Sequence, residues 1–196
     1  MKRIFDFVVS LLGLIILSPV FLIIAIIIKL DSKGPVFYKQ LRSGKNFQDF
    51  YLYKFRSMKV DSHSKGSITI GKRDPRVTNA GYYLRKFKLD ELPQLINVLK
   101  GEMSFVGPRP ELKEYVELYD GEQKKVLSVK PGITDYASIK FRNENELLAQ
   151  SDNPKDFYVK EVMPAKLKLN IDYVNKNNFF SDIKIIFITV FSIFRK

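Results

Sequence analysis

Two adjacent carboxylates, Asp90 and Glu91, are the side chains of this sequence best suited to chemistry. They stand at the start of a helix-forming stretch, just after three cations: Arg85, Lys86 and Lys88. A structural interpretation is open, in which Asp90 caps the helix and Glu91 favours the positive end of its dipole. Paired acids among cations also suit a site for Mg²⁺ and phosphates, where one acid attacks phosphorus and the other binds metal or moves a proton.

Two arginines favour the phosphate site. Arg109 lies between two prolines in "GPRP" (107–110), which restrict the backbone on both sides of one guanidinium. A fixed arginine is well suited to bidentate phosphate binding. A second turn, Pro131-Gly132, is followed by Arg142 in the same way. The sequence therefore predicts cations around the acid pair.

The composition narrows the chemistry further. The chain carries 33 Lys and Arg against 21 Asp and Glu, and its net charge of +12 favours nucleic acid, anionic lipid or phosphorylated substrates as partners. Cysteine is absent and there is one histidine, so thiolate chemistry is excluded and a zinc site is not expected. A metal would have oxygen ligands, as Mg²⁺ prefers. Neither a P-loop nor a dinucleotide-binding glycine motif is present.

The element that must place this site at a membrane is the N-terminal apolar run, residues 4–28. It holds 25 residues with one charge, Asp6, and as a helix it would be about 37 Å long, enough to cross the hydrocarbon core. A cleaved signal peptide is the alternative, but the run is too long for one and no small-residue cleavage site follows it.

Ser18-Pro19 lies just past the middle of this run and is predicted to break the helix. Lys2 and Arg3 precede the run, and lysines follow it. Basic segments prefer the cytoplasmic side, so both ends satisfy this preference only if the helix enters and leaves on the same face. We therefore expect residues 1–30 to form a re-entrant membrane helical hairpin, in preference to a simple crossing.

The rest of the chain is predicted to be α/β and mainly helical, with residues 31–178 as a compact cytoplasmic catalytic domain. The pattern predicts a β-hairpin over 35–58 with its turn at 42–46, and a loop over 59–80. Helices are expected at 81–87, 91–100 (ended by Gly101), 111–120 and 155–176. Residues 130–142 are expected to form a turn followed by a strand or an extended segment. Residues 179–196 are predicted to form an apolar helix at the membrane interface, with a core helix of the soluble domain as the alternative.

Several stretches carry a resemblance to a known family. They are the apolar N-terminal helix with Ser18-Pro19, "YKFRSM" (53–58), "RDPRVT" (73–78), "LDELPQLINVLKGEMSFVGPRP" (89–110) and "PGIT" (131–134). In these the sequence resembles, over nearly its whole length, the small monotopic phosphoglycosyl transferases among the bacterial sugar transferases. The resemblance implies transfer of a phospho-sugar from a UDP-sugar to polyprenol phosphate, releasing UMP. This would occur with Mg²⁺ at the cytoplasmic face of the bacterial inner membrane and would initiate surface glycan assembly, such as capsule or lipopolysaccharide.

The resemblance also implies roles for individual residues. Asp90 would attack the β-phosphate and form an aspartyl phospho-sugar, while Glu91 would bind Mg²⁺ and assist proton transfer, with Asp90 sharing the metal. The basic positions expected around the phosphates and nucleotide are Lys54, Arg85, Arg109 and Arg142, with the Pro131-Gly132 turn beside them. Arg85 would face the lipid phosphate. Downstream glycosyltransferases would use the product, a homodimer is left open, and no nucleic-acid partner is expected.

The chain departs from many relatives after "PGIT", where they have a glycine and then a short polar stretch. Here Asp135, Lys140 and Phe141 differ. This region is expected to face the nucleotide or sugar, so the sugar stays open. Without the multi-span extension of larger relatives, the chain is expected to be the minimal catalytic form. Two rivals remain: a non-catalytic lipid-binding scaffold, and a membrane-tethered nucleic-acid-binding domain, which the acids among the cations disfavour.

Overall fold

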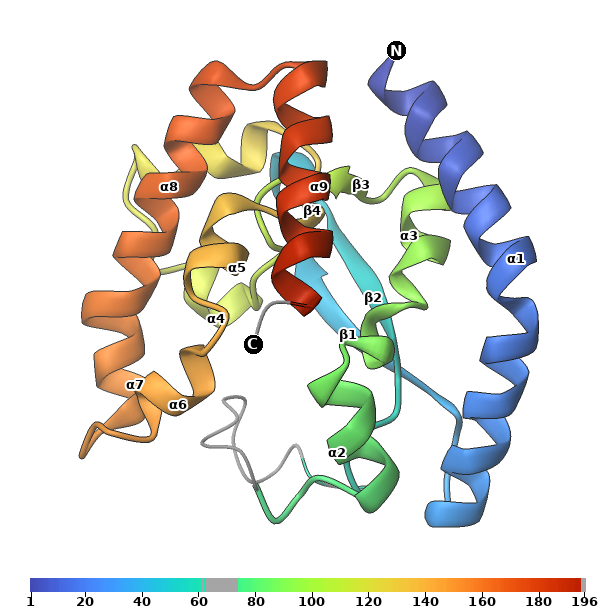
Figure 1. Ribbon diagram of the computed structural model, residues 1–196. Helices are drawn as coiled ribbons and strands as arrows, with labels where there is room; N and C mark the ends of the chain where they lie inside the picture. The colour runs from blue at the N-terminus through green and yellow to red at the C-terminus, as the bar shows by residue number, and fades with distance from the viewer. Residues whose placement is uncertain (61, 63–73, 195–196) are drawn as a thin grey trace.

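The described part of the chain folds mainly into helices with two small two-stranded sheets, which confirms the predicted fold class in outline (Figure 1). This computed structural model describes residues 1–60, 62 and 74–194, with side chains as far as Ser192, so most of the predicted loop at 59–80 lies outside it. The α-helices are α1 (Lys2–Asp31), α2 (Asn79–Lys86), α3 (Gln94–Lys100), α4 (Lys113–Val116), α5 (Tyr136–Lys140), α6 (Glu144–Leu148), α7 (Pro154–Phe157), α8 (Met163–Lys176) and α9 (Phe179–Phe194).

The strands and the tighter helical segments complete the order. The strands are β1 (Phe37–Ser43), β2 (Asp49–Phe55), β3 (Ser104–Val106) and β4 (Gly132–Thr134). The 3-10 segments are η1 (Lys45–Phe47), η3 (Leu89–Glu91) and η4 (Gln123–Ser128), and η5 (Tyr158–Val162) is π-helical.

The N-terminal helix α1 continues through Ser18-Pro19, so the predicted break is not seen. Proline has no N–H for the carbonyl of Ile15, one turn earlier. The Ser18 hydroxyl donates to that same carbonyl at 2.8 Å, which satisfies the acceptor that the proline leaves free. The helix therefore bends along its length without ending (Figure 1).

The start of α1 is bound to the body of the domain. Lys2 pairs with Asp182 of α9 at 2.7 Å, and Arg3 donates to the backbone carbonyls of Val98 and Leu99 at the end of α3. Asp6 is buried and accepts the backbone N–H of Phe105. These contacts hold the first turns of a strongly apolar helix against polar groups of the domain.

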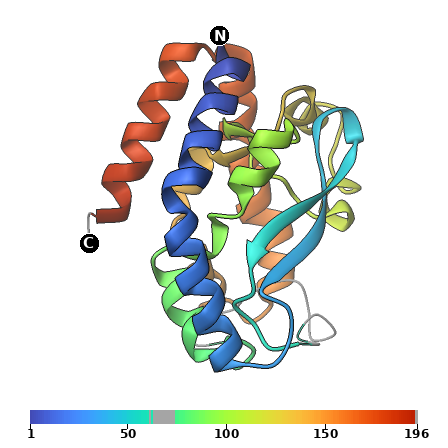
Figure 2. The same cartoon turned by 90° about the vertical axis from the view of Figure 1, so that its right-hand side faces the viewer.

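The end of α1 is bound to the same domain. Arg56, which follows β2, donates to the carbonyls of Ile28 and Ser32 at 3.3 and 2.7 Å, so it satisfies acceptors at the helix C-terminus. Asp31 accepts the backbone N–H of Ala80 in α2 at 3.1 Å. The helix thus runs along the domain with both ends attached to it (Figure 2).

The predicted β-hairpin is confirmed. Strands β1 and β2 pair antiparallel from Phe37↔Phe55 to Ser43↔Asp49, so the turn lies at residues 44–48, two positions later than expected. Its tight end has a backbone bond from Gly44 to Gln48. The inward side chains of β2, Phe50 and Leu52, pack against the core beneath α3. This hairpin fixes the position of Lys54.

Local capping signals set the start of α2 and the end of α3, the helices on either side of the acids. The Thr78 side chain accepts the N–H of Gly81 at the start of α2, and Gly101 ends α3 with φ +83°. Beyond α3, the parallel pair β3–β4 brings the "GPRP" turn beside Pro131-Gly132. A side chain on Gly132 would lie 2.1 Å from the backbone nitrogen of Gly107, so this crossing requires glycine.

The C-terminal half differs from expectation at two places. The helix expected at 111–120 shortens to α4, and the extended segment expected at 130–142 ends at Thr134, where α5 replaces it. Helical structure over 155–176 is confirmed as the succession of α7, η5 and α8. The buried side chains of η5 and α8 join a core cluster with residues from earlier in the chain. The cluster consists of Tyr115, Val116, Tyr119, Val126, Leu127, Leu148, Tyr158, Val162, Met163 and Leu167.

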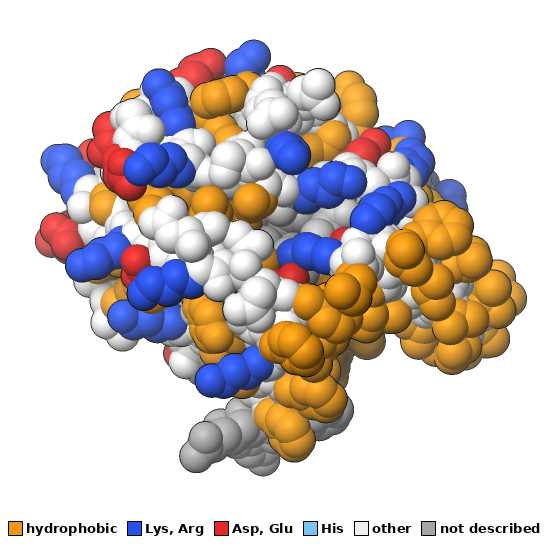
Figure 3. Space-filling view, turned by 90° about the horizontal axis from the view of Figure 1, so that it is seen from above, with side chains coloured by type: hydrophobic (Ala, Val, Ile, Leu, Met, Phe, Trp, Pro, Cys, Tyr) orange, Lys and Arg blue, Asp and Glu red, His pale blue; other side chains and the backbone are white. Residues whose placement is uncertain are grey.

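Apolar side chains are exposed on both α1 and α9. Within the described chain, α1 is the helix long and apolar enough to span a membrane, and only 11% of its most apolar window is buried. On α9, Ile185 is fully buried while Phe187 and Phe191 are 61% and 70% exposed. Figure 3 shows the apolar side chains gathered on two neighbouring ridges, with charged groups over much of the remaining face. The exposed apolar side chains of α1 and of α9 suit contact with lipid.

Candidate active site

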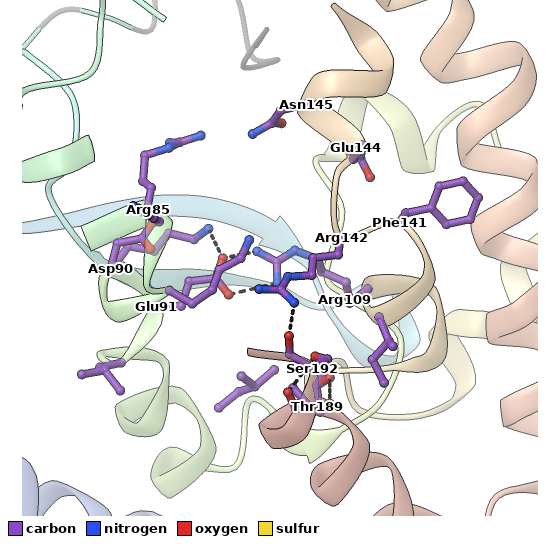
Figure 4. A pocket seen from close by; sticks show the side chains of 18 of the residues that line it. Arg85, Asp90, Glu91, Arg109, Phe141, Arg142, Glu144, Asn145, Thr189 and Ser192 are labelled. Atoms are coloured by element: carbon purple, nitrogen blue, oxygen red, sulfur yellow. Dashed lines mark hydrogen bonds and ion pairs between the residues drawn. The ribbon is translucent and has the colours of Figure 1, made fainter. Parts of the chain in front are cut away.

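A cavity of about 520 Å³ brings the predicted site residues together. Its lining includes Lys54 of β2, both acids, Arg85, Arg109 and Arg142. Figure 4 shows Arg109 directly beside Glu91. Residues 131–132 do not line the cavity; they support the turn of Arg109 from behind through the β3–β4 pair. Ser18 and Pro19 lie in α1, away from the cavity lining.

Glu91 is held by two cations. Lys54 Nζ lies 3.0 Å from its Oε1, and Arg109 contacts both carboxylate oxygens, with Nη1 at 3.1 Å from Oε2. Burial alone would raise the pKa of Glu91, but Arg109 and Lys54 outweigh it and hold the pKa well below its usual value. Glu91 is therefore ionised and fixed in place.

Asp90 has the opposite environment. Its side chain is buried in η3, and among the described residues its Oδ1 has no hydrogen-bond partner. Burial first, and then the charge of Glu91, raise its pKa despite the opposing cations. The helix-cap interpretation is wrong, because α3 begins at Gln94 after Pro93 and has no side-chain cap. The buried, unbonded oxygen thus has no structural role in the described residues.

Lys88, the residue before η3, helps to direct the acids into the cavity. Lys88 has a left-handed backbone conformation with φ +58°, which separates α2 from η3. The short 3-10 turn then places Asp90 and Glu91 on the cavity side while Leu89 packs on the core beneath α1. A continuous helix over these positions would have rotated the acids progressively around its axis.

Lys54 and Arg109 respond to burial and to Glu91 in different ways. Burial lowers the pKa of Lys54, and Glu91 only partly offsets this. The charge of Glu91 raises the pKa of Arg109, whose guanidinium stays ionised in any case. Lys54, Glu91 and Arg109 therefore form a fixed cation–anion–cation group beside the unbonded Asp90 oxygen.

The "GPRP" turn is fixed by Asp135. This fully buried side chain accepts the backbone N–H of Arg109 at 2.8 Å through Oδ2, and its other oxygen accepts the N–H of Ser138 at the start of α5. The sequence prediction that this departure faces the donor is wrong for Asp135. Its position directly before a helix was a capping signal, which the expectation of a strand concealed.

Sequence reasoning missed part of the wall opposite the acids. Glu144 and Asn145 of α6, Lys166 of α8, and Thr189 and Ser192 of α9 all line the cavity. Predicted Arg142 extends toward α9, where its guanidinium donates to the carbonyl of Ser192 (Figure 4). These residues come from helices far apart in sequence, so spacing alone carried no signal for them.

Glu111 was also missed, although it directly follows the "GPRP" turn. Arg42 Nη1 lies 3.1 Å from its Oε1, and the Tyr158 hydroxyl donates to its Oε2. Burial would raise the pKa of Glu111, but Arg42 and then Lys166 keep it lowered. Glu111 therefore secures the far side of the turn that presents Arg109.

The described residues contain no group of three or more His, Cys, Asp or Glu side chains that could hold a metal alone. Asp90 offers one free oxygen, whereas both Glu91 oxygens already contact cations. A hard cation here would take its other ligands from water and from substrate phosphate, as Mg²⁺ commonly does. The donor set is compatible with that arrangement.

The apolar α1 and the acid pair among cations define a class, membrane-associated proteins with a site for phosphate esters. Within it, the chain belongs to the bacterial sugar transferase family, whose family model matches residues 1–196. It is 40% identical to the UDP-glucose:undecaprenyl-phosphate glucose-1-phosphate transferase of Escherichia coli (strain K12), over 97% of this chain and 39% of that protein. It is 38% identical to the uncharacterized sugar transferase EpsL of Bacillus subtilis (strain 168), over 97% of this chain and 85% of that protein.

A further relative is named for a different sugar. The chain is 46% identical over 121 residues to a putative undecaprenyl-phosphate N-acetylgalactosaminyl 1-phosphate transferase of Bacillus subtilis (strain 168), covering 62% of this chain and 68% of that protein. The chain spans about two fifths of the length of the Escherichia coli relative. The two relatives whose names give substrates share the lipid, undecaprenyl phosphate, and differ in the sugar.

Proposed function

We propose that this protein transfers a phospho-sugar from a UDP-sugar to undecaprenyl phosphate, releasing UMP and forming a polyprenyl-diphosphate-sugar. The observation that carries the proposal is the buried, unbonded oxygen of Asp90 beside a Glu91 that is fully engaged by cations. A carboxylate oxygen kept free of hydrogen bonds in a cationic cavity is available to attack phosphorus. The names of the relatives supply the substrates of the proposal.

Two displacements at the same phosphorus account for the reaction. An oxygen of Asp90 attacks the β-phosphorus of the donor, the bond from that phosphorus to the bridging oxygen breaks, and UMP leaves with that oxygen. An oxygen of the lipid phosphate then attacks the same phosphorus, and the bond to Asp90 breaks. Lys54, Arg85, Arg109 and Arg142 bind the phosphates and offset the charge that develops on their oxygens.

The roles of Asp90 and Glu91 follow from their partners. Glu91 orients Lys54 and Arg109, and it stays ionised because both cations contact it. Asp90, with Glu91 in support, would hold Mg²⁺, which supplies neutralising charge to the diphosphate when bound. The free Oδ1 of Asp90 supports this assignment. For Glu91 to ligate the metal it must share an oxygen with one of its cations.

The placement at the membrane is part of the proposal. Both ends of α1 are attached to the same domain, which supports a helix that enters the bilayer and returns on the cytoplasmic side. Exposed apolar residues of α1 and α9 would enter the lipid on one side of the domain (Figure 3). The lipid phosphate would then lie at headgroup level, near the cavity, in the bacterial inner membrane.

UMP release tests the activity. Purified protein in nanodiscs would be given a panel of UDP-sugars with polyprenyl phosphate and Mg²⁺. We expect UMP release with at least one donor, and a phospho-sugar adduct on Asp90 that is absent in Asp90→Asn. An adduct on Glu91 would overturn the assignment of the nucleophile. Absence of UMP release with every donor would overturn the proposed function and favour the lipid-binding scaffold.

A further inference from the structure

The wall of the cavity opposite the acid pair carries polar groups that the phosphate chemistry does not use. Glu144 and Asn145 begin α6, and Lys166 of α8 lies beside them in the lining. Figure 4 shows the two α6 side chains across the cavity from Asp90 and Glu91, with Asn145 pointing into it toward Arg85. Glu144 is the one carboxylate of the described lining besides the acid pair.

Glu144 is held in a fixed orientation. Its Oε2 accepts a hydrogen bond from Lys166 Nζ at 2.7 Å, and these side chains are 26% and 13% exposed. The Lys166 ammonium also lies over the ring of Tyr158, 5.3 Å from its centre, and the Tyr158 hydroxyl is bound by Glu111. The second oxygen of Glu144, Oε1, receives no hydrogen bond from the part of the chain described, so it is free to accept one.

The chemistry of this wall excludes phosphate and favours hydroxyl groups. An ionised carboxylate accepts hydrogen bonds only, so it repels phosphate oxygens and attracts O–H donors. The neighbouring amide of Asn145 can both donate and accept. The phosphates have Arg85, Arg109 and Arg142 as partners elsewhere in the same cavity. A nucleotide-sugar donor offers its hydroxyls as the complementary groups.

We propose that Glu144, positioned by Lys166, and Asn145 form a subsite that binds a vicinal diol of the nucleotide-sugar donor. The inference rests on the proposed function, because it needs a donor bound in this cavity. The diol has two sources, the ribose and the transferred sugar. In both cases Glu144 and Asn145 contribute to donor binding and leave the bond-breaking steps to the opposite wall.

Donor kinetics of Glu144→Gln test the subsite. The glutamine keeps the size of the side chain but loses the charge that pairs with Lys166 and strengthens the hydrogen bond to a hydroxyl. We expect the KM for the UDP-sugar to rise about tenfold or more, with kcat nearly unchanged, because a charge-assisted hydrogen bond is lost equally from bound donor and transition state. Asn145→Ala, at an exposed position, should raise KM in the same direction without affecting the fold.

Glu122→Gln is the matched control. Glu122 also pairs with a lysine, Lys125 at 2.6 Å, but this pair lies on the surface and outside the cavity lining. We expect its KM to equal that of the wild type. Thermal unfolding of all three variants separates a change in binding from a change in folding.

Inhibition by nucleotides distinguishes the two sources of the diol. If the ribose is bound, wild-type protein prefers UMP to its 2′-deoxy analogue and Glu144→Gln loses the preference. If the sugar is bound, UMP inhibits both proteins equally and Glu144→Gln loses selectivity among UDP-sugar epimers. Turnover with unchanged KM, inhibition and selectivity in both Glu144→Gln and Asn145→Ala would overturn the subsite alone. A wild type that releases no UMP from any donor would overturn the proposed function and the subsite with it.

Discussion

Asp90 and Glu91 are neighbours with the same functional group, yet their surroundings give them different properties. Glu91 meets Lys54 and Arg109, which lower its pKa, whereas Asp90 is buried beside the charge of Glu91, which raises its pKa. The difference arises from contacts brought by β2 and by the "GPRP" turn, not from the sequence next to the acids. Two adjacent acids can therefore have separate roles at one pH.

Asp90→Asn should abolish transfer without destabilising the protein. The ionised, buried and unbonded carboxylate opposes folding at neutral pH, since its pKa is raised in the folded state. We expect UMP release to fall by about 10³-fold or more and the Tm at neutral pH to rise or stay unchanged. Any gain in Tm should shrink as the pH falls and disappear below the ordinary value of 3.8, where wild-type Asp90 is protonated in both states. A clearly lowered Tm would show that Asp90 has a structural role.

Glu91→Gln should have the opposite effect on folding. It leaves Lys54 and Arg109 near each other without their shared anion. We expect the variant to be less stable than the wild type by about 1–3 kcal/mol at neutral pH, measured by thermal unfolding of both proteins in one detergent. The pKa of Glu91 is lowered in the folded state, so its stabilisation is present above the ordinary value of 4.5 and is lost as the pH falls below it. Equal Tm values at neutral pH would contradict the role of Glu91 as an anchor.

Among the site residues, those that sequence could predict are the ones grouped along the chain. Arg85 and Lys88 flank the acids, and two prolines mark Arg109. Glu144 could not be found in this way, because its partner Lys166 is 22 residues away and their contact depends on the packing of α6 beside α8. The free oxygen of Asp90 was equally hidden, since a helix cap and an unbonded acid look alike in sequence.

At the scale of elements, strong local signals predicted structure well and competing signals did not. The Gly101 stop and the alternating strands of the hairpin are confirmed. The segment 136–140 was expected to be part of a strand or extended segment, but Asp135 caps it as a helix. At Ser18-Pro19 the proline signal was genuine, and a single hydroxyl compensated it. Such compensations depend on individual side-chain contacts that periodicity does not contain.

Asp135→Ala tests how α5 and the "GPRP" turn depend on each other. The change removes the acceptor for the backbone N–H groups of Arg109 and Ser138 inside the protein. We expect a loss of about 1–3 kcal/mol in stability and a raised KM for the donor, because Arg109 is no longer held in place. Asn153→Ala is the matched control, since it removes the cap of α7 at the surface. It should cost about 1 kcal/mol and leave KM unchanged. An unchanged KM in Asp135→Ala would show that Pro108 and Pro110 hold Arg109 without it.

At the scale of the whole molecule, the apolar helices and the cationic cavity lie next to each other. Leu95 lies close to Gly13 of α1, where an added Cβ would be 3.3 Å from its Cδ1, and it also lines the cavity. Helix α9 exposes Phe191, while its Thr189 lines the cavity. Helix α9 thus faces lipid on one side and the site on the other, and Leu95 of α3 lies between α1 and the cavity. This arrangement suits a reaction in which one substrate is dissolved in water and the other is held in the membrane.

The topology of α1 gives the sharpest test at this scale. A helix of this length can cross a bilayer, but here Lys2 and Arg3 at its start bind the domain, and Arg56 of the same domain binds the carbonyls at its end. A crossing would have to break one of these groups of contacts. We therefore expect both ends on the cytoplasmic side, with the middle of the helix inside the lipid.

Single cysteines can measure this, because the natural sequence has none. A membrane-impermeant maleimide applied to inverted vesicles should label cysteines at Met1, Lys33 and Gly121, the last a control site with open space around it. The exposed Ile16 replaced by cysteine should resist labelling until detergent is added, since its exposure in the structure would be to lipid. In intact spheroplasts none of the four should react. Labelling of the Met1 position from outside would establish a crossing, and it would mean that the Lys2–Asp182 pair does not form in the membrane-bound protein.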